Sequence, residues 1–172
     1  KDGGTATEAD VASGVQTTKT VLSEALSVLN VANKIINGDE AKSVVEPNGN
    51  VTKGTAETKL NDGQQGVTRT YLPYVAGNDN TSIHSHDVQV KKQPDGTYSY
   101  NDARIPGPDD PGTFAKYATN VIVGNLGAPT ITPIPGKSEP KVSLPSQGAV
   151  FYDRSGKPIL ELKASAITKI LK

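Results

Sequence analysis

The stretch TSIHSHDVQVKKQPDGTYSYNDARIPGPDDPGTFAKYATNVIVGN, residues 81–125, decides the fold. It predicts, in order, a short strand, a hairpin, a proline-rich loop, a short helix and a central strand: residues 81–86, 88–100, 105–111, 112–118 and 120–124. The run Val121-Ile122-Val123 is apolar without interruption, which is typical of a strand buried on both faces. The first strand carries both histidines of the chain.

An amphipathic helix is predicted upstream of this stretch, from Thr18 onward. Its apolar residues recur at spacings of three and four: Leu22, Leu26, Leu29, Ala32 and Ile36. The pair Asn37-Gly38 is a suitable helix end, because glycine adopts the left-handed conformation that follows many helices. Residues 1–17 lack this periodicity, so we expect a linker or the end of a preceding region there and one domain over residues 18–172.

Strands are also predicted on both sides of the deciding stretch. Those upstream are residues 41–46, 50–60 and 67–75, and those downstream are residues 149–153 and 158–162. A proline-rich surface excursion, residues 125–148, and a closing helix near residues 163–171 complete the chain. Helices and strands in this mixed order predict the α+β class, with a mixed β-sheet flanked by helices.

Composition narrows the possible functions. The chain has 172 residues, with 18 basic and 18 acidic side chains and no long run of Lys or Arg, which argues against nucleic acid as the main partner. It has no cysteine, so disulfides, thiolate metal sites and cysteine nucleophiles are excluded. No apolar run approaches the roughly 20 residues of a membrane span. The chain starts with Lys and lacks Met, so we expect a piece of a longer polypeptide.

The triplet His84-Ser85-His86 is the strongest chemical signal. On a strand, residues two apart point to the same face, so both imidazoles can reach one point while Ser85 points away. Zinc is bound by imidazole nitrogen and carboxylate oxygen, and catalytic sites keep one position open for water. Taken alone, such a triplet is more often a pair of ordinary polar strand residues than a metal site.

The neighbours of the triplet strengthen the metal interpretation. Gly107-Pro108-Asp109-Asp110 follows in a proline-rich setting, and the apolar run 120–124 and residues 150–157 come later. Over roughly residues 18 to 165 the chain resembles the JAB/MPN (JAMM) metallopeptidase family, whose motif is a Glu, then HxHP, then S-x-x-D. It is most similar to the JAB-like toxin domains at the C-terminal ends of bacterial polymorphic and Rhs-type effectors. The resemblance implies a JAB/MPN-like sheet with cytidine-deaminase-like layering.

The resemblance also implies roles for individual residues. His84, His86 and Asp110 would hold zinc, with Asp109 as the rival carboxylate; otherwise Asp109 is an acidic residue favoured at a helix start. A glutamate would act as the general base. Glu40 is the first choice because it lies 44 residues before His84, and Glu46 and Glu57 follow in that order. The implied reaction is peptide or isopeptide hydrolysis by a metal-activated water.

The chain departs from the family pattern at two positions. Asp87 stands where the family has Pro, and Gly107 stands where the family has a Ser that helps to stabilise the oxyanion. A lost donor of this kind can reduce a rate by ~10²-fold or more. Ser82, Ser85 or Thr113 are possible substitutes. A catalytically inactive JAB-like binding module, or a secreted or surface interaction module with an incidental triplet, therefore remain alternatives.

The resemblance implies partners and a location as well. A protein or peptide would be the substrate, and a cognate immunity protein would bind the domain. The domain would be secreted or delivered from a bacterial cell as the C-terminal part of a larger polypeptide.

Overall fold

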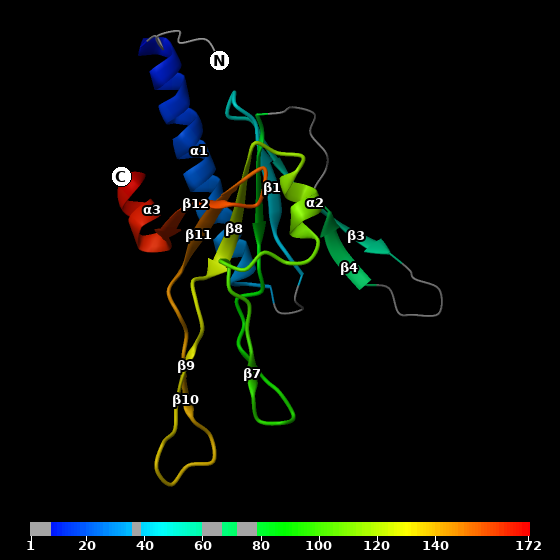
Figure 1. The fold of residues 1–172 in the computed structure, drawn as a ribbon, viewed down its shortest axis with the longest axis vertical. Coiled ribbons are helices and arrows are strands. Elements are labelled where there is room, and N and C mark those ends of the chain that lie inside the picture. The colour runs from blue at the N-terminus through cyan, green and yellow to red at the C-terminus, as the bar shows by residue number, and fades with distance from the viewer. Residues whose placement is uncertain (1–7, 36–38, 60–66, 72–78) are drawn as a thin grey trace.

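The computed structural model describes residues 8–35, 39–59, 67–71 and 79–172 (Figure 1). The described residues contain a six-stranded sheet in the order β12-β11-β8-β5-β1-β2. Its strands are β1 (Lys42–Val45), β2 (Val51–Lys53), β5 (Thr81–Ser85), β8 (Thr119–Asn125), β11 (Gln147–Asp153) and β12 (Pro158–Lys163). Only β5 and β8 pair in parallel; the other neighbours in this sheet are antiparallel. The α+β class with a mixed sheet is thereby confirmed.

Helices cover both faces of this sheet (Figure 1). They are α1 (Glu8–Ala32), α2 (Asp110–Phe114) and α3 (Ala164–Ile170). Three two-stranded sheets also lie in the described residues: β3 (Thr55–Lys59) with β4 (Val67–Tyr71), β6 (Lys91–Lys92) with β7 (Tyr98–Ser99), and β9 (Thr130–Thr132) with β10 (Lys141–Ser143). None of the described helices has the length and apolar composition needed to cross a membrane.

Helix α1 begins ten residues before the predicted start at Thr18, so residues 8–17, which we expected to be a linker or the end of a preceding region, are helical. This segment has few apolar residues, and periodicity therefore did not reveal it. A helix extends readily from a packed nucleus, because each added residue gains one hydrogen bond at a small entropic cost. The predicted helix end at Asn37-Gly38 lies outside the described residues, and α1 itself ends at Ala32.

The main core lies between α1 and one face of the sheet. The helix buries the stripe Val21, Leu22, Ala25, Val28, Leu29 and Ala32. The sheet contributes side chains that alternate along its strands, including Ile83 of β5 and Val121 and Val123 of β8, and Ile167 of α3 joins them. The next positions on these strands, such as Ile122, therefore point to the opposite face.

The second core lies on that opposite face, beneath α2. It contains Ala103, Phe114, Ile122, Leu126, Val150 and Tyr152. The rings of Phe114 and Tyr152 stack with centroids 5.2 Å apart. Because Phe114 is the last residue of α2, this contact fixes the short helix on the sheet. The structure places the start of this helix at Asp110, two residues earlier than predicted, with a proline in its first turn.

Two hairpins extend from the main sheet, and each consists of two short strands joined by a turn. The hairpin β6–β7 separates the histidine strand from α2, as expected for residues 88–100. The proline-rich excursion 125–148 includes the hairpin β9–β10, and both hairpins project from the body of the fold (Figure 1). An ion pair of 2.7 Å between Lys92 and Glu139 connects them.

Tyr152 makes the fold sensitive to alkaline pH. Burial raises the pKa of Tyr152 to about 12, and nearby carboxylates add to the effect. Its hydroxyl donates a hydrogen bond of 2.7 Å to the carbonyl of Ala103. The native state therefore holds this proton more tightly than the unfolded chain, whose tyrosine titrates near pH 10.

We expect stability to be constant below pH 10 with respect to this group and to fall as pH rises from 10 to 12, by about 2–3 kcal/mol in total. Urea denaturation at several pH values measures this loss. Tyr152→Phe will be less stable at neutral pH by about 1 kcal/mol, because a hydrogen bond is lost, but will lose less between pH 10 and 12. The exposed Tyr100→Phe is the control, and equal alkaline losses in both variants would contradict the assignment.

Candidate metal centre

The register of the sheet sets the direction of the histidine side chains. His84 lies opposite Lys42 of β1 and beside Ile122 of β8. Residues paired in this way share a face of the sheet, and Ile122 belongs to the core beneath α2. His84 therefore points to the α2 face, and so does His86, whose N–H continues the pairing by donating to Val123. The predicted geometry of the triplet is confirmed.

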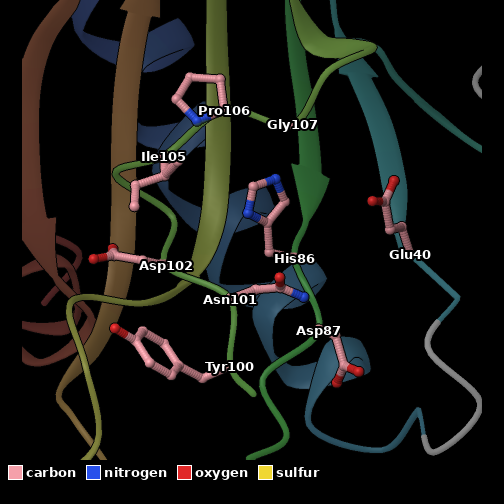
Figure 2. Close-up of a pocket in the computed structure, with 9 residues that line it drawn as sticks. All are labelled: Glu40, His86, Asp87, Tyr100, Asn101, Asp102, Ile105, Pro106 and Gly107. Atoms are coloured by element: carbon pink, nitrogen blue, oxygen red, sulfur yellow. The ribbon is translucent and has the colours of Figure 1, made fainter. Parts of the chain in front are cut away.

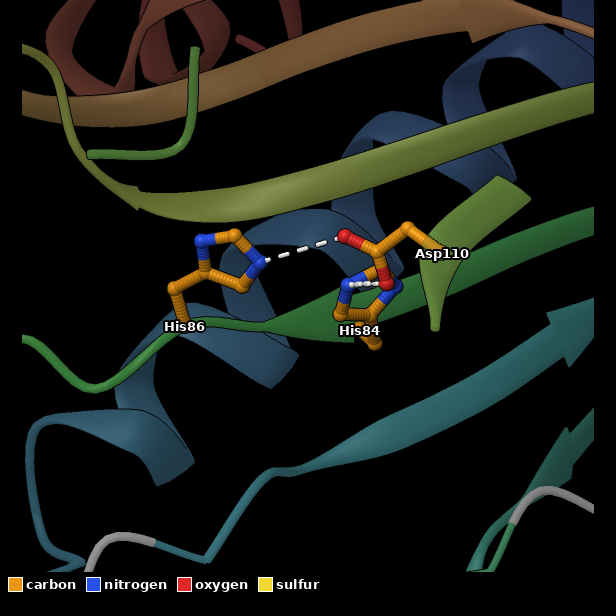
Figure 3. A group of neighbouring side chains, drawn as sticks. All are labelled: His84, His86 and Asp110. Carbon is orange, nitrogen blue, oxygen red and sulfur yellow. Dashed lines mark ion pairs between the residues drawn. The ribbon is translucent and has the colours of Figure 1, made fainter. Parts of the chain in front are cut away.

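The carboxylate of Asp110 meets both imidazoles (Figure 3). Its Oδ1 lies 3.1 Å from Nε2 of His84, and its Oδ2 lies 3.5 Å from Nε2 of His86. One donor atom from each of the three residues lies within 4.8 Å of the others. Asp109, the rival carboxylate, is exposed and is not part of this group among the described residues. The tertiary structure thus selects Asp110 over Asp109.

The triad has the burial and donor set of a metal site. His84 is 4% exposed and His86 is 8% exposed. Nε2 of His84 has no hydrogen-bond partner in the described residues, although Asp110 is close, so its direction does not suit a hydrogen bond to that carboxylate. Leaving a buried polar atom unpaired costs about 1–3 kcal/mol. A tetrahedral zinc has donor atoms about 3.3 Å apart. The two contacts of Asp110 with the imidazoles, 3.1 and 3.5 Å, are near this spacing, and all three donor atoms lie within 4.8 Å of one another, so the donor set fits this ion.

Asp110 carries the charge that a metal ligand needs. Burial raises the pKa of this carboxyl, but the contacts with His84 and His86 and the hydrogen bond from the backbone of Gly107 outweigh burial and hold the pKa well below its usual range. The carboxylate is therefore ionised at neutral pH. A metal ion binds this form without displacing a proton.

The loop before α2 positions Asp110. The N–H of Gly107 donates to Asp110 Oδ2 at 2.6 Å. Further upstream, two hydrogen bonds hold the backbone of Ala103. Its N–H donates to the carbonyl of Asn125, and its carbonyl accepts from the hydroxyl of Tyr152. The bidentate ion pair of Arg104 with Glu161, at 2.8 and 2.9 Å, attaches the same loop to β12. These contacts hold in place the loop that leads to Asp110.

Gly107 leaves room for a side chain. A Cβ built at this residue would lie 3.5 Å from Oδ2 of Asp110, an ordinary van der Waals distance. The serine of the resembling family could therefore be accommodated here without a clash. Its absence in this chain is a chemical difference rather than a steric requirement.

Glu40 lies beside the triad. The pairing of Lys42 with His84 continues for one more residue, because Ser85 and Ala41 exchange hydrogen bonds through Ser85 N–H and Ser85 Oγ. Continued by one further step, this register puts Glu40 opposite His86. Both residues line one pocket of about 400 Å³ (Figure 2). The carboxylate of Glu40 lies 3.0 Å from Lys42 Nζ.

The other two candidate bases lie elsewhere. Glu46 follows the far end of β1, four residues beyond Lys42, which is roughly 14 Å along an extended strand. Glu57 is on β3, opposite Arg69 in a separate two-stranded sheet, and its side chain lies outside the described residues. Of the three glutamates, Glu40 is the one that the described structure brings to the histidines.

Two of the three possible substitutes for the missing serine, Ser82 and Ser85, have other contacts. The hydroxyl of Ser82 donates to Asn120, and the hydroxyl of Ser85 accepts the N–H of Ala41 on the opposite face of the sheet. Asn101, which the sequence did not single out, lines the pocket next to His86 (Figure 2). Its side-chain amide is a neutral donor of the kind that stabilises an oxyanion. No motif in the sequence marked this residue, because the hairpin β6–β7 brings it to the site.

Asp87, which stands where the resembled family has a proline, makes two contacts within the segment after His86. Its Oδ1 accepts the N–H of Gln89 at 2.9 Å, and its Oδ2 forms an ion pair of 2.7 Å with Lys91. An aspartate that accepts the N–H two residues later stabilises a turn. These two contacts hold the segment directly after His86 without a proline.

Comparison of the chain with protein-family models, with curated proteins and with solved structures finds no match. The resemblance to the JAB/MPN family thus remains a hypothesis from the motif residues.

Proposed function

We propose that this chain is a zinc-dependent hydrolase of amide bonds, a peptidase or isopeptidase. His84, His86 and Asp110 are the zinc ligands in this proposal, and Glu40 is the general base. One observation carries it: two buried imidazoles and an ionised carboxylate converge, and one of these imidazoles, that of His86, lines a pocket together with Glu40. Two imidazoles and one carboxylate are a donor set of catalytic zinc sites, in which a fourth position stays open.

The chemistry that bound zinc supplies is a water with its pKa lowered from ~15.7 to about 7 and a Lewis acid for a carbonyl oxygen. Glu40 accepts the proton of the attacking water on a carboxylate oxygen and returns it to the leaving amine. Lys42, 3.0 Å from Oε2 of Glu40, holds that carboxylate in place. In this proposal the side-chain amide of Asn101, which lines the same pocket, donates to the developing oxyanion in the role that Gly107 cannot fill.

A second candidate is a catalytically inactive member of the same fold that acts by binding. The observation in its favour is Gly107, which offers no hydroxyl beside the triad. The third interpretation, an incidental triplet on an interaction module, would have gained from histidines far from any carboxylate. The distances of 3.1 and 3.5 Å to Asp110 remove that support.

The biological setting of the proposal comes from the resemblance. A peptidase of this kind would act as the toxic domain of a bacterial effector, delivered or secreted as the C-terminal part of a larger polypeptide. Its substrate would be a protein or peptide, and a cognate immunity protein would neutralise it.

Glu40→Gln tests the proposal. The zinc-loaded protein is incubated with a peptide mixture from digested cell extract, and new amino termini are labelled and counted by mass spectrometry. We expect cleavage by the unchanged protein and a loss of about 10²–10⁴-fold in Glu40→Gln, because the amide cannot accept the proton. Zinc content should stay the same, since Glu40 is not a ligand.

Glu46→Gln is the matched control, because it removes a carboxylate from the same strand region but far from the triad. It should cleave like the unchanged protein. Tight zinc binding with no difference between the unchanged protein and Glu40→Gln would instead favour the inactive binding module.

A further inference from the structure

We propose that Asn120, together with Ser82, is a positioning residue of the metal centre. It fixes α2 along β5 and thereby sets where the carboxylate of Asp110 meets the imidazoles. The proposal rests on the proposed function in one respect, because zinc is the ion that Asp110 would bind. Asn120 is not one of the three donor residues, and it acts on them through α2.

Asn120 and Ser82 are polar side chains buried beneath α2. Both are 0% exposed. They lie opposite each other in the parallel pairing of β5 with β8, two residues before His84 and Ile122. Because alternate residues of a strand share a face, both side chains point to the α2 face. Burying polar groups there costs free energy unless their hydrogen bonds are made.

Asn120 uses both ends of its side-chain amide. Its Oδ1 accepts the hydroxyl of Ser82. Its Nδ2 donates to the carbonyl of Phe114 at 3.2 Å and to the carbonyl of Tyr117 at 3.4 Å. The last carbonyls of a helix have no partner within the helix, so a side-chain donor of this kind stabilises the helix end. One buried amide thus connects the histidine strand to the end of α2.

A backbone contact attaches the same end of α2 to β5. The N–H of Ala118 donates to the carbonyl of Asn80 at 3.1 Å, one residue before β5 begins. The other end of α2 begins at Asp110, whose carboxylate lies beside His84 (Figure 3). The helix is therefore attached to the beginning of β5 at one end and to the histidines at the other.

The lengths of the two elements between these attachments are similar. From Asp110 to Phe114 the helix rises about 6 Å along its axis. From Ser82 to His84 the strand advances about 7 Å. The hydrogen bonds of a helix make a segment this short move as a unit. A displacement of the end held by Asn120 therefore carries Asp110 along the histidine strand.

A metal centre is sensitive to such a displacement. Zinc bonds to nitrogen and oxygen are about 2.0–2.2 Å long, and a functional site needs its side chains held within about 0.5 Å. Apolar side chains in place of Ser82 and Asn120 could give similar stability, because buried polar groups contribute little net free energy. They would not select one position of α2, as the directional hydrogen bonds of the amide do.

The experiment compares three variants with the unchanged protein, metal-free and in zinc titrations. Ser82→Ala removes the connection to the strand, and Asn120→Leu removes the connection to α2. Ser43→Ala is the matched control, because Ser43 is 1% exposed on the neighbouring strand β1 and its hydroxyl donates to Glu24 of α1 at 2.6 Å. Urea denaturation of the metal-free chains measures how far each variant is destabilised.

We expect zinc affinity to fall about tenfold in Ser82→Ala and up to about 100-fold in Asn120→Leu, because groups that orient a metal ligand are worth about 10–100-fold in affinity. Ser43→Ala should bind zinc like the unchanged protein, although its stability also falls. The visible absorption of bound Co²⁺, which depends on ligand geometry, should change in the first two variants only. Unchanged zinc affinity in Ser82→Ala would overturn the proposal, even if Asn120→Leu does not fold.

The amide of Gly107 gives a second measurement that needs no metal. Its N–H donates to Oδ2 of Asp110 at 2.6 Å, so its NMR signal reports where this carboxylate lies. In the metal-free protein we expect the signal to shift in Ser82→Ala and Asn120→Leu. It should stay in place in Ser43→Ala, and an equal shift in the control would assign the change to general loosening of the fold.

The two proposals fail in different ways in this experiment. A shifted Gly107 signal in Ser82→Ala, in a protein that takes up no zinc, would leave the positioning of Asp110 standing and reject the zinc hydrolase. One equivalent of zinc, bound with the same affinity in Ser82→Ala and with an unmoved Gly107 signal, would reject the positioning role and leave the metal centre intact.

Discussion

His84→Ala is expected to abolish stoichiometric zinc binding. The unchanged protein, purified without chelator, should contain about one zinc per chain by mass spectrometry, because two imidazoles and one carboxylate of the described residues converge on one point. Removing His84 leaves a single imidazole and Asp110, and two ligands do not complete a zinc site. Titration calorimetry should then show an affinity loss of more than 100-fold.

Matched variants separate ligation from general damage to the fold. Asp110→Asn keeps the shape of the side chain but removes its charge, and we expect it to lose most of its zinc. Asp109→Asn changes the adjacent exposed carboxylate and should keep a full equivalent. Circular dichroism checks that each variant is folded. A wild-type chain that binds no zinc, or a folded His84→Ala chain that still binds one equivalent, would contradict the metal centre.

Zinc should also stabilise the fold. A ligand that binds only the native state adds about 2.7 kcal/mol when its free concentration is about 100 times its Kd. Chelation should therefore lower the midpoint of thermal unfolding in the unchanged protein. The same treatment should leave His84→Ala unaffected.

Phe114→Ala is expected to produce the largest loss of stability, about 3–5 kcal/mol. The side chain is buried, stacks on Tyr152 and is the one buried side chain of α2. Its removal leaves a cavity and frees the helix that begins with Asp110. Urea denaturation of the metal-free protein measures the loss, and zinc affinity should fall with it because one ligand is no longer held in place.

Phe114→Leu provides a measurable intermediate if the alanine variant does not fold. Leucine fills part of the space, so its loss should be smaller than that of alanine while zinc is retained. Ile105→Ala, at a side chain that is 67% exposed, is the surface control and should change stability by no more than about 0.5 kcal/mol. A Phe114→Ala chain within that range would show that α2 is held by other contacts.

Several features of the fold followed from local patterns. Residues 81–86 were predicted as the strand that became β5, the apolar run 121–123 predicted β8, and turn residues predicted the hairpin of β6 and β7. These predictions of strands and of a hairpin succeed because strand and turn preferences depend on residues that are neighbours in the sequence. The start of α1 was missed for the same reason: residues 8–17 carry no apolar stripe, so nothing local distinguished them from a linker.

The candidate site, like the fold, was predictable from the sequence only in part. The sequence by itself determined that His84 and His86 point to one side of a strand, because alternation is a property of any extended backbone. It ranked Asp110 above Asp109 and Glu40 above Glu46 only through the resemblance, with the second of each pair kept as an alternative. Those choices depend on where α2 and β1 dock against the histidine strand, and docking is a matter of packing between segments distant in the chain.

Tertiary structure decided what surrounds the histidines. The contact of Phe114 with Tyr152 sets α2, and α2 brings Asp110 rather than Asp109 to the imidazoles. The register of β1 with β5 brings Glu40 level with His86, and the β6–β7 hairpin returns Asn101 and Asp102 to the same pocket. Local preference thus shaped the strand that holds the two histidines. Long-range packing brought Asp110 and the pocket-lining residues to them, because residues so far apart in sequence meet only in the folded chain.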